Sequence, residues 1–141
     1  MEGNVNMKTC DNRDYNLEMG QKYYHGTGVK KNYRKAAGIF GSLAEQGDAD
    51  ARNYLGVMYE NGQGVKQDYV KAAEWFRKAA EQGYALAQYN LGNMYLVGDG
   101  VEWDDTIAAE WYAKAAGQGY ASAQAGLNYY YYCNNFISMG I

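Results

Sequence analysis

The sequence contains no proline, only two cysteines and a single histidine among its 141 residues. Without proline no helix is interrupted by a missing backbone donor, so the 18 glycines are expected to mark the helix ends. Cys10 and Cys133 lie near opposite ends of the chain and form neither a CxxC pair nor a disulfide framework. His25 has no second histidine beside it and is a poor candidate for a metal ligand. We therefore expect no metal and no cofactor.

Strong charge and long apolar runs are also missing. The net charge of −3 argues against a general nucleic-acid binder. No segment approaches the ~20 consecutive apolar residues that a membrane span requires, so no membrane partner is expected. Residues 1–11 lack the apolar core of a secretion signal, which predicts a cytoplasmic location as the sequence stands, or a periplasmic one if a signal had been removed.

Glycine pairs recur through the sequence with a fixed period. Gly26-Thr27-Gly28-Val29 returns as Gly62-Gln63-Gly64-Val65 and again as Gly98-Asp99-Gly100-Val101, and the spacing is 62 − 26 = 36 residues each time. The same period relates Gln46-Gly47, Gln82-Gly83 and Gln118-Gly119, and also Tyr23, Tyr59, Tyr95 and Tyr131. Because many independent positions share one period, the chain is predicted to be a repeat protein.

Each repeat is predicted to contain two helices. In the middle repeat the first helix spans about residues 49–61, where Ala51, Leu55, Met58 and Tyr59 have helical spacing. Gly62 follows it, as a left-handed C-terminal cap requires. The second helix starts after Asp68, whose carboxylate can accept hydrogen bonds from the free backbone amides of the first turn. Asn32 and Asp104 occupy the equivalent places in the other two repeats.

Three glycines lie inside the first helices, at Gly20, Gly56 and Gly92. Each costs about 1 kcal/mol relative to alanine, so their recurrence predicts close approach of a neighbouring helix. We expect Trp75 and Trp111 to supply the large side chains that pack against small ones in the core. On that interpretation Trp75→Ala removes about 3–5 kcal/mol of stability.

The repeat motif resembles a known family. Ala-x-x-x-Leu-Gly-x-x-Tyr, Gly-x-Gly-Val, Asp-Tyr-x-Lys-Ala-Ala-x-Trp and Lys-Ala-Ala-x-Gln-Gly are similar to the Sel-1-like repeats, which are relatives of tetratricopeptide repeats. The resemblance implies an all-α fold, a right-handed α/α superhelical solenoid of about three helix-pair repeats plus a C-terminal capping helix. The expected boundaries are an N-terminal extension 1–13, a solenoid 14–136 (repeats 14–47, 48–83 and 84–119, capping helix 120–136) and a tail 137–141.

In tetratricopeptide relatives the first helix of each repeat lines a concave groove, and the resemblance implies a protein or peptide partner there. The residues then expected to bind the partner are Asp50, Asn53, Val57, Glu60, Leu86, Tyr89, Asn93, Leu96, Tyr129 and Tyr132. This set is polar and acidic at one end, and aromatic at the other, where exposed tyrosine suits an interface. Alternatively, some of the tyrosines pack against the C-terminal tail. A homodimer through the terminal repeats is a further alternative.

The expected function is that of an adaptor or scaffold without catalytic activity. None of the serines lies in a nucleophile-like turn, so no catalytic residue is assigned. Two alternatives follow from the resemblance, because bacterial members of the family include inhibitors or immunity proteins that neutralise a toxin or enzyme, and some cysteine-rich members are described as β-lactamases. The second is the weaker alternative, because Cys10 and Cys133 do not recur with the repeat.

Overall fold

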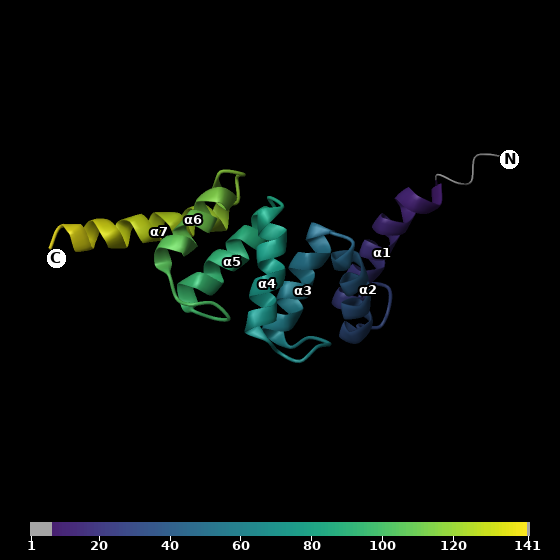
Figure 1. Cartoon of the computed structure of the whole chain (residues 1–141). Helices are drawn as coiled ribbons and strands as arrows, with labels where there is room; N and C mark the ends of the chain where they lie inside the picture. Colours follow the sequence, from purple (N-terminus) through teal and green to yellow (C-terminus); the bar gives the residue numbers. More distant parts are fainter. Residues whose placement is uncertain (1–6, 141) are drawn as a thin grey trace. The chain divides into compact units, whose positions relative to one another are not determined.

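The computed structural model describes residues 7–140, with side chains at 12–137, 139 and 140. This part of the chain consists of seven α-helices joined by short loops, and it contains no strand (Figure 1). The helices are α1 (Met7–His25), α2 (Tyr33–Glu45), α3 (Ala49–Asn61), α4 (Tyr69–Glu81), α5 (Ala85–Val97), α6 (Asp105–Ala116) and α7 (Ala121–Ser138). They form two compact units, α1–α3 and α4–α7, which divide after Asp68.

The helix ends confirm Asn32 and Asp104 as N-cap residues. The Asn32 side chain accepts a hydrogen bond from the backbone amide of Lys35 at 3.0 Å, and Asp104 accepts one from Ile107 at 3.0 Å. At the C-terminal ends of α3 and α5, Gly62 and Gly98 have φ values of 66° and 82°. Since side chains rarely adopt this left-handed conformation, glycine sets the point at which each helix stops.

In the first unit, the core is built around the Phe40 ring of α2. A Cβ added to Gly20 of α1 would lie 2.6 Å from Phe40 Cε1, so only glycine permits this approach of the two helices. The Phe40 ring also stacks on Tyr54 of α3, with centroids 4.4 Å apart and an interplanar angle of 7°. One aromatic ring therefore joins three helices.

The second unit repeats this contact with a tyrosine. A Cβ on Gly92 of α5 would lie 2.7 Å from Tyr112 Cε1 of α6. The Tyr112 hydroxyl donates a hydrogen bond to Asn93 Oδ1 at 2.6 Å, and burial raises the pKa of Tyr112 to about 12. The surrounding core consists of Ala108, Ala109, Ala115, Ala123 and Leu127. The close approach expected at Gly20 and Gly92 is confirmed.

The expectation that tryptophans fill the core is not confirmed. Trp75 and Trp111 are only half-buried, and in each case the ammonium of the lysine three residues later lies over the indole, at 4.5 and 4.6 Å from the ring centroid. The buried aromatic positions are Phe40, Phe76 and Tyr112, one residue later in the repeat. Adjacent residues on a helix point about 100° apart, so the alanine stripe of α4 and α6 faces the core together with this later position, and the indoles lie at its edge.

Candidate protein-binding surface

On α3 the residues expected to bind a partner divide into internal and surface groups. Asn53 is buried, with 5% of its surface exposed, so its amide is not presented to solvent. Val57 and Glu60 are half-exposed. Asp50 is engaged within the unit, because Arg13 Nη2 lies 3.1 Å from its Oδ2.

Arg13 is a surface residue that the sequence interpretation missed. Its guanidinium also forms ion pairs with Asp14 at 2.8 Å and with Asp48 at 2.5 Å. Asp48 in turn caps α3 by accepting a hydrogen bond from the Ala51 backbone amide. Hydrogen bonds to Asp14 and Asp48 raise the pKa of Arg13 above its usual range. Because α1 begins at Met7, Arg13 lies within a helix rather than an extension, and it neutralises part of the acidic end of the expected surface.

On α5 two of the four expected residues serve the packing of the unit. The half-buried Tyr89 ring packs against Tyr112 and Tyr120, with ring centroids 5.7 and 5.1 Å away. Asn93 accepts a hydrogen bond from the Tyr112 hydroxyl. Leu86 is half-buried, and Leu96 is exposed at 40% of its surface. Of the four expected residues on α5, Leu96 is therefore the most open to a partner.

On α7 the expected tyrosines are exposed and lie in a longer stripe. Tyr129 and Tyr132 are exposed at 66% and 63%, and the Tyr132 ring packs 5.4 Å from Phe136. The α7 stripe consists of the exposed residues Ser122, Ala125, Tyr129, Tyr132, Phe136 and Met139. Residues 115–141 contain no charged side chain. Phe136 and Met139 were not predicted, although their spacing of seven residues from Tyr129 and Tyr132 is the signal that identifies them.

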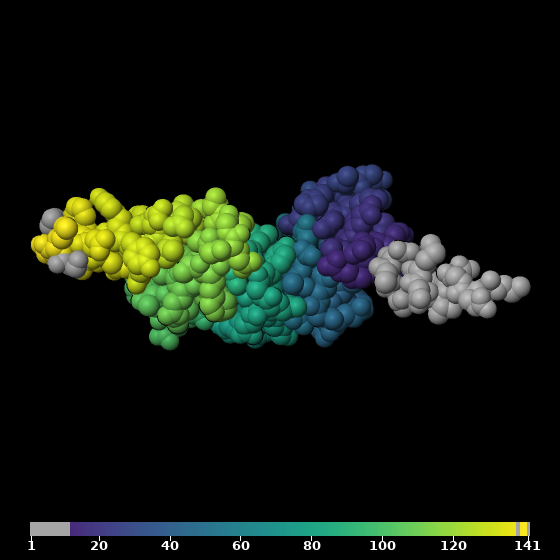
Figure 2. All heavy atoms as spheres, turned by 90° about the horizontal axis from the view of Figure 1, so that it is seen from above, coloured from purple at the N-terminus to yellow at the C-terminus, as the bar shows by residue number. Residues whose placement is uncertain are grey.

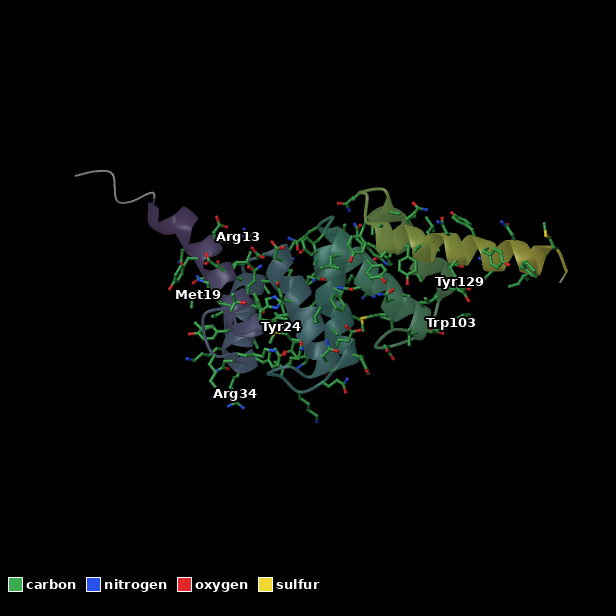
Figure 3. All side chains as sticks on the ribbon, turned by 180° about the vertical axis from the view of Figure 1, so that it is seen from behind. Arg13, Met19, Tyr24, Arg34, Trp103 and Tyr129 are labelled. Carbon is green, nitrogen blue, oxygen red and sulfur yellow. The ribbon has the colours of Figure 1, made fainter. Side chains whose placement is uncertain are left out.

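An apolar cavity of about 190 Å³ lies beside the α7 stripe, between α6, α7 and the loop before α6. Leu96, Trp103, Tyr129 and Ile137 contribute to its lining, and Figure 3 labels Trp103 and Tyr129 on their two elements. Trp103 is exposed at 62% and was also missed, because it lies in a loop outside the helical pattern. A cavity with this lining suits an apolar side chain of a partner.

A wider depression of about 520 Å³ lies next to it and has a more polar lining. Arg77 and the loop 100–104 border it, and the Arg77 guanidinium donates a hydrogen bond to the Tyr95 hydroxyl at 2.7 Å. Because its Arg77 and Tyr95 side chains are already paired with each other across α4 and α5, the apolar cavity is the better candidate for a binding role.

The described residues contain no group of three or more His, Cys, Asp or Glu side chains that could hold a metal ion. The Cys133 thiol is half-buried, and the Cys10 side chain lies outside the described residues. His25 Nε2 lies 3.4 Å from the Tyr54 hydroxyl. Among the helices described here, none has the length and hydropathy of a transmembrane segment.

Helix pairs that recur every 36 residues, with a glycine of the first helix against an aromatic ring of the second, define an α-solenoid repeat protein. The chain belongs to the Sel1 repeat family, whose sequence model matches residues 14–48, 49–84 and 85–120. Repeats of this family generally serve as protein–protein interaction modules, and the fold is typically non-enzymatic. The predicted family and the all-α helix-pair architecture are thus confirmed.

Solved structures of Sel1 repeat proteins superpose closely on this chain. The Escherichia coli protein c5321, described as a protective antigen present in uropathogenic strains, is 39% identical with a TM-score of 0.83; the match covers 88% of this chain and 27% of that protein. A Sel1 repeat protein from Oxalobacter formigenes is 35% identical with a TM-score of 0.81, covering 90% of this chain and 52% of the other. This chain therefore spans about a quarter and a half of these two relatives.

A third structure shows the shared fold alone. Cysteine-rich protein B of Helicobacter pylori is 23% identical with a TM-score of 0.69, and the match covers 87% of this chain and 97% of that one. No match was found among curated proteins.

Proposed function

We propose that this chain is an adaptor or scaffold that holds a protein or peptide on the exposed faces of its A helices, the first helices of the repeats. The observation that carries the proposal is the α7 stripe, which is aromatic, exposed and free of charge, with an apolar cavity at its side. Protein interfaces are depleted of charge at their centres and enriched in tyrosine, which has a large area and few rotatable bonds.

The arrangement of the cavity supports the same role. Leu96 and Tyr129 border it from two helices, so a partner that crosses the α7 stripe can insert an apolar side chain between them. A buried apolar anchor surrounded by contacts that exclude water is the usual form of a binding hot spot. The α3 surface, with Val57 and Glu60, is proposed to add selectivity rather than affinity, because Glu60 is half-exposed and a charge that faces solvent contributes little to affinity.

The test is affinity capture from a native lysate with the full chain. The variant Leu96→Ala, Tyr129→Ala, Tyr132→Ala removes exposed side chains only, whereas Tyr89→Ala would open a cavity against Tyr112. The matched control is Tyr131→Ala, because Tyr131 is 55% exposed and lies about 200° around α7 from Tyr129.

The proposal predicts a specific protein that wild type and the control retain and the triple variant loses. A partner that binds the triple variant as well as wild type would contradict the assignment of the surface. If the captured protein is a toxin or an enzyme whose activity falls on binding, the adaptor interpretation is replaced by that of an inhibitor or immunity protein.

A further inference from the structure

The α7 stripe has the spacing of a helix–helix interface. Its six residues are separated by 3, 4, 3, 4 and 3 positions, which is the a/d pattern of a coiled coil. α7 has 18 residues, whereas α3 and α5 have 13 each, so its last turns extend beyond the repeat. Met139 retains helical dihedral angles at the C-cap (φ −85°, ψ 0°), and the C-terminal end of α7 stands clear of α5 and α6 (Figures 1 and 2).

The neighbouring face of α7 is not suited to a further helix of the repeat type. In α5 this face carries Gly92, which admits the Tyr112 ring of α6. One period later the residue is Asn128, which is exposed and accepts a hydrogen bond from Gln124 at 2.9 Å. Since the small residue is replaced by a polar one, a helix that packs as α6 does would meet the Asn128 side chain.

Along the α7 stripe the residues change from small to large, so an antiparallel second copy brings small residues opposite large ones at both ends. The N-terminal members, Ser122 and Ala125, are small, and the C-terminal members, Phe136 and Met139, are large. Two antiparallel copies of α7 centred between residues 130 and 131 place Ser122 opposite Met139, Ala125 opposite Phe136 and Tyr129 opposite Tyr132. In every pair the two residue numbers add to 261, so all three pairs fit one register, and each occurs twice by symmetry.

We propose that the α7 stripe binds a second copy of the same chain, with the two α7 helices antiparallel in this register. Small residues of one copy then face large residues of the other in the outer layers, and tyrosine faces tyrosine in the central ones, as a well-packed helix interface allows. The arrangement is two-fold symmetric, which is the commonest form of a homo-oligomer interface. It gives a defined geometry to the homodimer through the terminal repeats that the sequence raised as an alternative.

Charge and area agree with a second copy as the occupant. Self-association of a charged helix face brings like charges together, and α7 has none to oppose it. With about 200 Å² for a full side chain, the exposed fractions of the four large residues correspond to roughly 500 Å² per copy. The total of about 1,000 Å² is the lower limit for a specific interface, so we expect a dissociation constant on the order of micromolar.

This inference rests on the proposed function in that it names one partner for the α7 part of the binding surface. The α3 surface, with Val57 and Glu60, stays available to an unlike partner. A chain that dimerises and captures no other protein would refute the adaptor proposal alone. A monomeric chain whose captured partner depends on Tyr129 would refute the dimer alone.

The experiment is sedimentation equilibrium of the full chain between about 1 and 200 μM, a range that brackets the expected dissociation constant. Wild type is expected to form dimers in this range, and Ala125→Lys and Phe136→Glu are each expected to weaken dimerisation at least tenfold. An equimolar mixture of the two variants should regain it, because the introduced lysine then faces the introduced glutamate across one layer and the native pair occupies the other. Tyr131→Glu, on the other side of α7, is the control and should dimerise as wild type does.

A wild-type chain that stays monomeric at all concentrations would overturn the proposal, as would equal loss of dimer in Tyr131→Glu and Phe136→Glu. Far-UV circular dichroism of each variant shows whether it is folded.

The antiparallel direction of the two α7 helices is tested by disulfide cross-linking under oxidising conditions, in a Cys10→Ser, Cys133→Ser background. Ser122→Cys with Met139→Cys should form interchain disulfides, and Ser122→Cys alone should not, because the two copies of position 122 lie 17 residues apart along the pair, about 25 Å. A dimer linked through Ser122→Cys alone would indicate parallel helices and contradict the register.

Discussion

The two units of the chain have the same internal contact and different surfaces. In both, a glycine of an A helix touches an aromatic ring of the following helix, through Gly20 and Phe40 in the first and Gly92 and Tyr112 in the second. The surface of the first unit is tied by ion pairs around Arg13, whereas α7 of the second unit has no charge at all. One repeat skeleton therefore supports two kinds of surface, of which the charged one favours selectivity and the uncharged one favours contact area.

The largest effect should come from removing the shared ring. Phe40→Ala and Tyr112→Ala are each expected to lower the free energy of unfolding by about 3–5 kcal/mol, because each leaves a cavity between packed helices. Trp75→Ala, at the half-buried position, should cost less than half as much. Urea unfolding followed by circular dichroism measures all three. A cost for Trp75→Ala equal to that of Phe40→Ala would show that the core is assigned to the wrong aromatic position.

The glycine side of the contact can be tested in both units at once. Gly20→Ala and Gly92→Ala each place a methyl group within 3 Å of a ring, so we expect a net loss of about 1–3 kcal/mol despite the better helix propensity. Gly38→Ala is the matched control, because Gly38 lies within α2 with nothing near its Cβ, and it should gain up to about 1 kcal/mol. Unfolding of the three variants under identical conditions compares them; stabilisation by all three would exclude close packing at Gly20 and Gly92.

The electrostatic difference predicts a response to salt in the first unit. Asp48→Ala removes the cap of α3 and one partner of Arg13, and should cost about 1–2 kcal/mol, most of it from the cap. Asp104→Ala removes a cap for which the described residues supply no ion pair, and it serves as the comparison. The difference between the two variants should shrink when the NaCl concentration rises to about 1 M, because the Arg13 side chain is 47% exposed and salt screens a charge that faces solvent. A difference that is independent of salt would mean that the Arg13 pairs add no stability.

The smallest effect concerns pH and belongs to the second unit. Burial raises the pKa of Tyr112 to about 12, above the usual value of about 10, so the unfolded chain releases this proton first. The contribution of the protonated Tyr112 hydroxyl to the stability of the fold is complete below about pH 10 and is lost as the pH rises from about 10 to 12. Tyr112→Phe should reduce this loss, as measured by urea midpoints at about pH 9 and 11.5. An equal fall in both proteins would assign the pH dependence to other tyrosines.

The helices themselves could be predicted from the sequence because one period fixes their caps and their glycines together. The expected helix at 49–61 is observed as α3 with the same ends, since Gly62 leaves no other place for it to stop. The choice between Trp75 and Phe76 as core residue could not be made, because two adjacent aromatic residues satisfy the same pattern. Only the packed alanines of α4 decide which of them faces inward.

The binding surface was less accessible to sequence reasoning. Helical phase places Asn53, Tyr89 and Asn93 on the outer face of an A helix, but it cannot show which side chains of adjacent helices reach over them. Tyr112 does so in the second unit, where its hydroxyl binds Asn93. The end of the α7 stripe was missed because α7 was expected to stop at residue 136, two residues before its observed end.

Backbone amide exchange shows directly whether the A-helix surface of the second unit binds protein. The full chain is compared alone at about 1 μM, at a concentration about one hundred times higher, and at about 1 μM with the protein it captures. We expect slower exchange in peptides from the C-terminal end of α5 and from α7 whenever a second copy or a partner is bound. Slower exchange confined to α2, α4 and α6, with α7 unchanged in every sample, would contradict it.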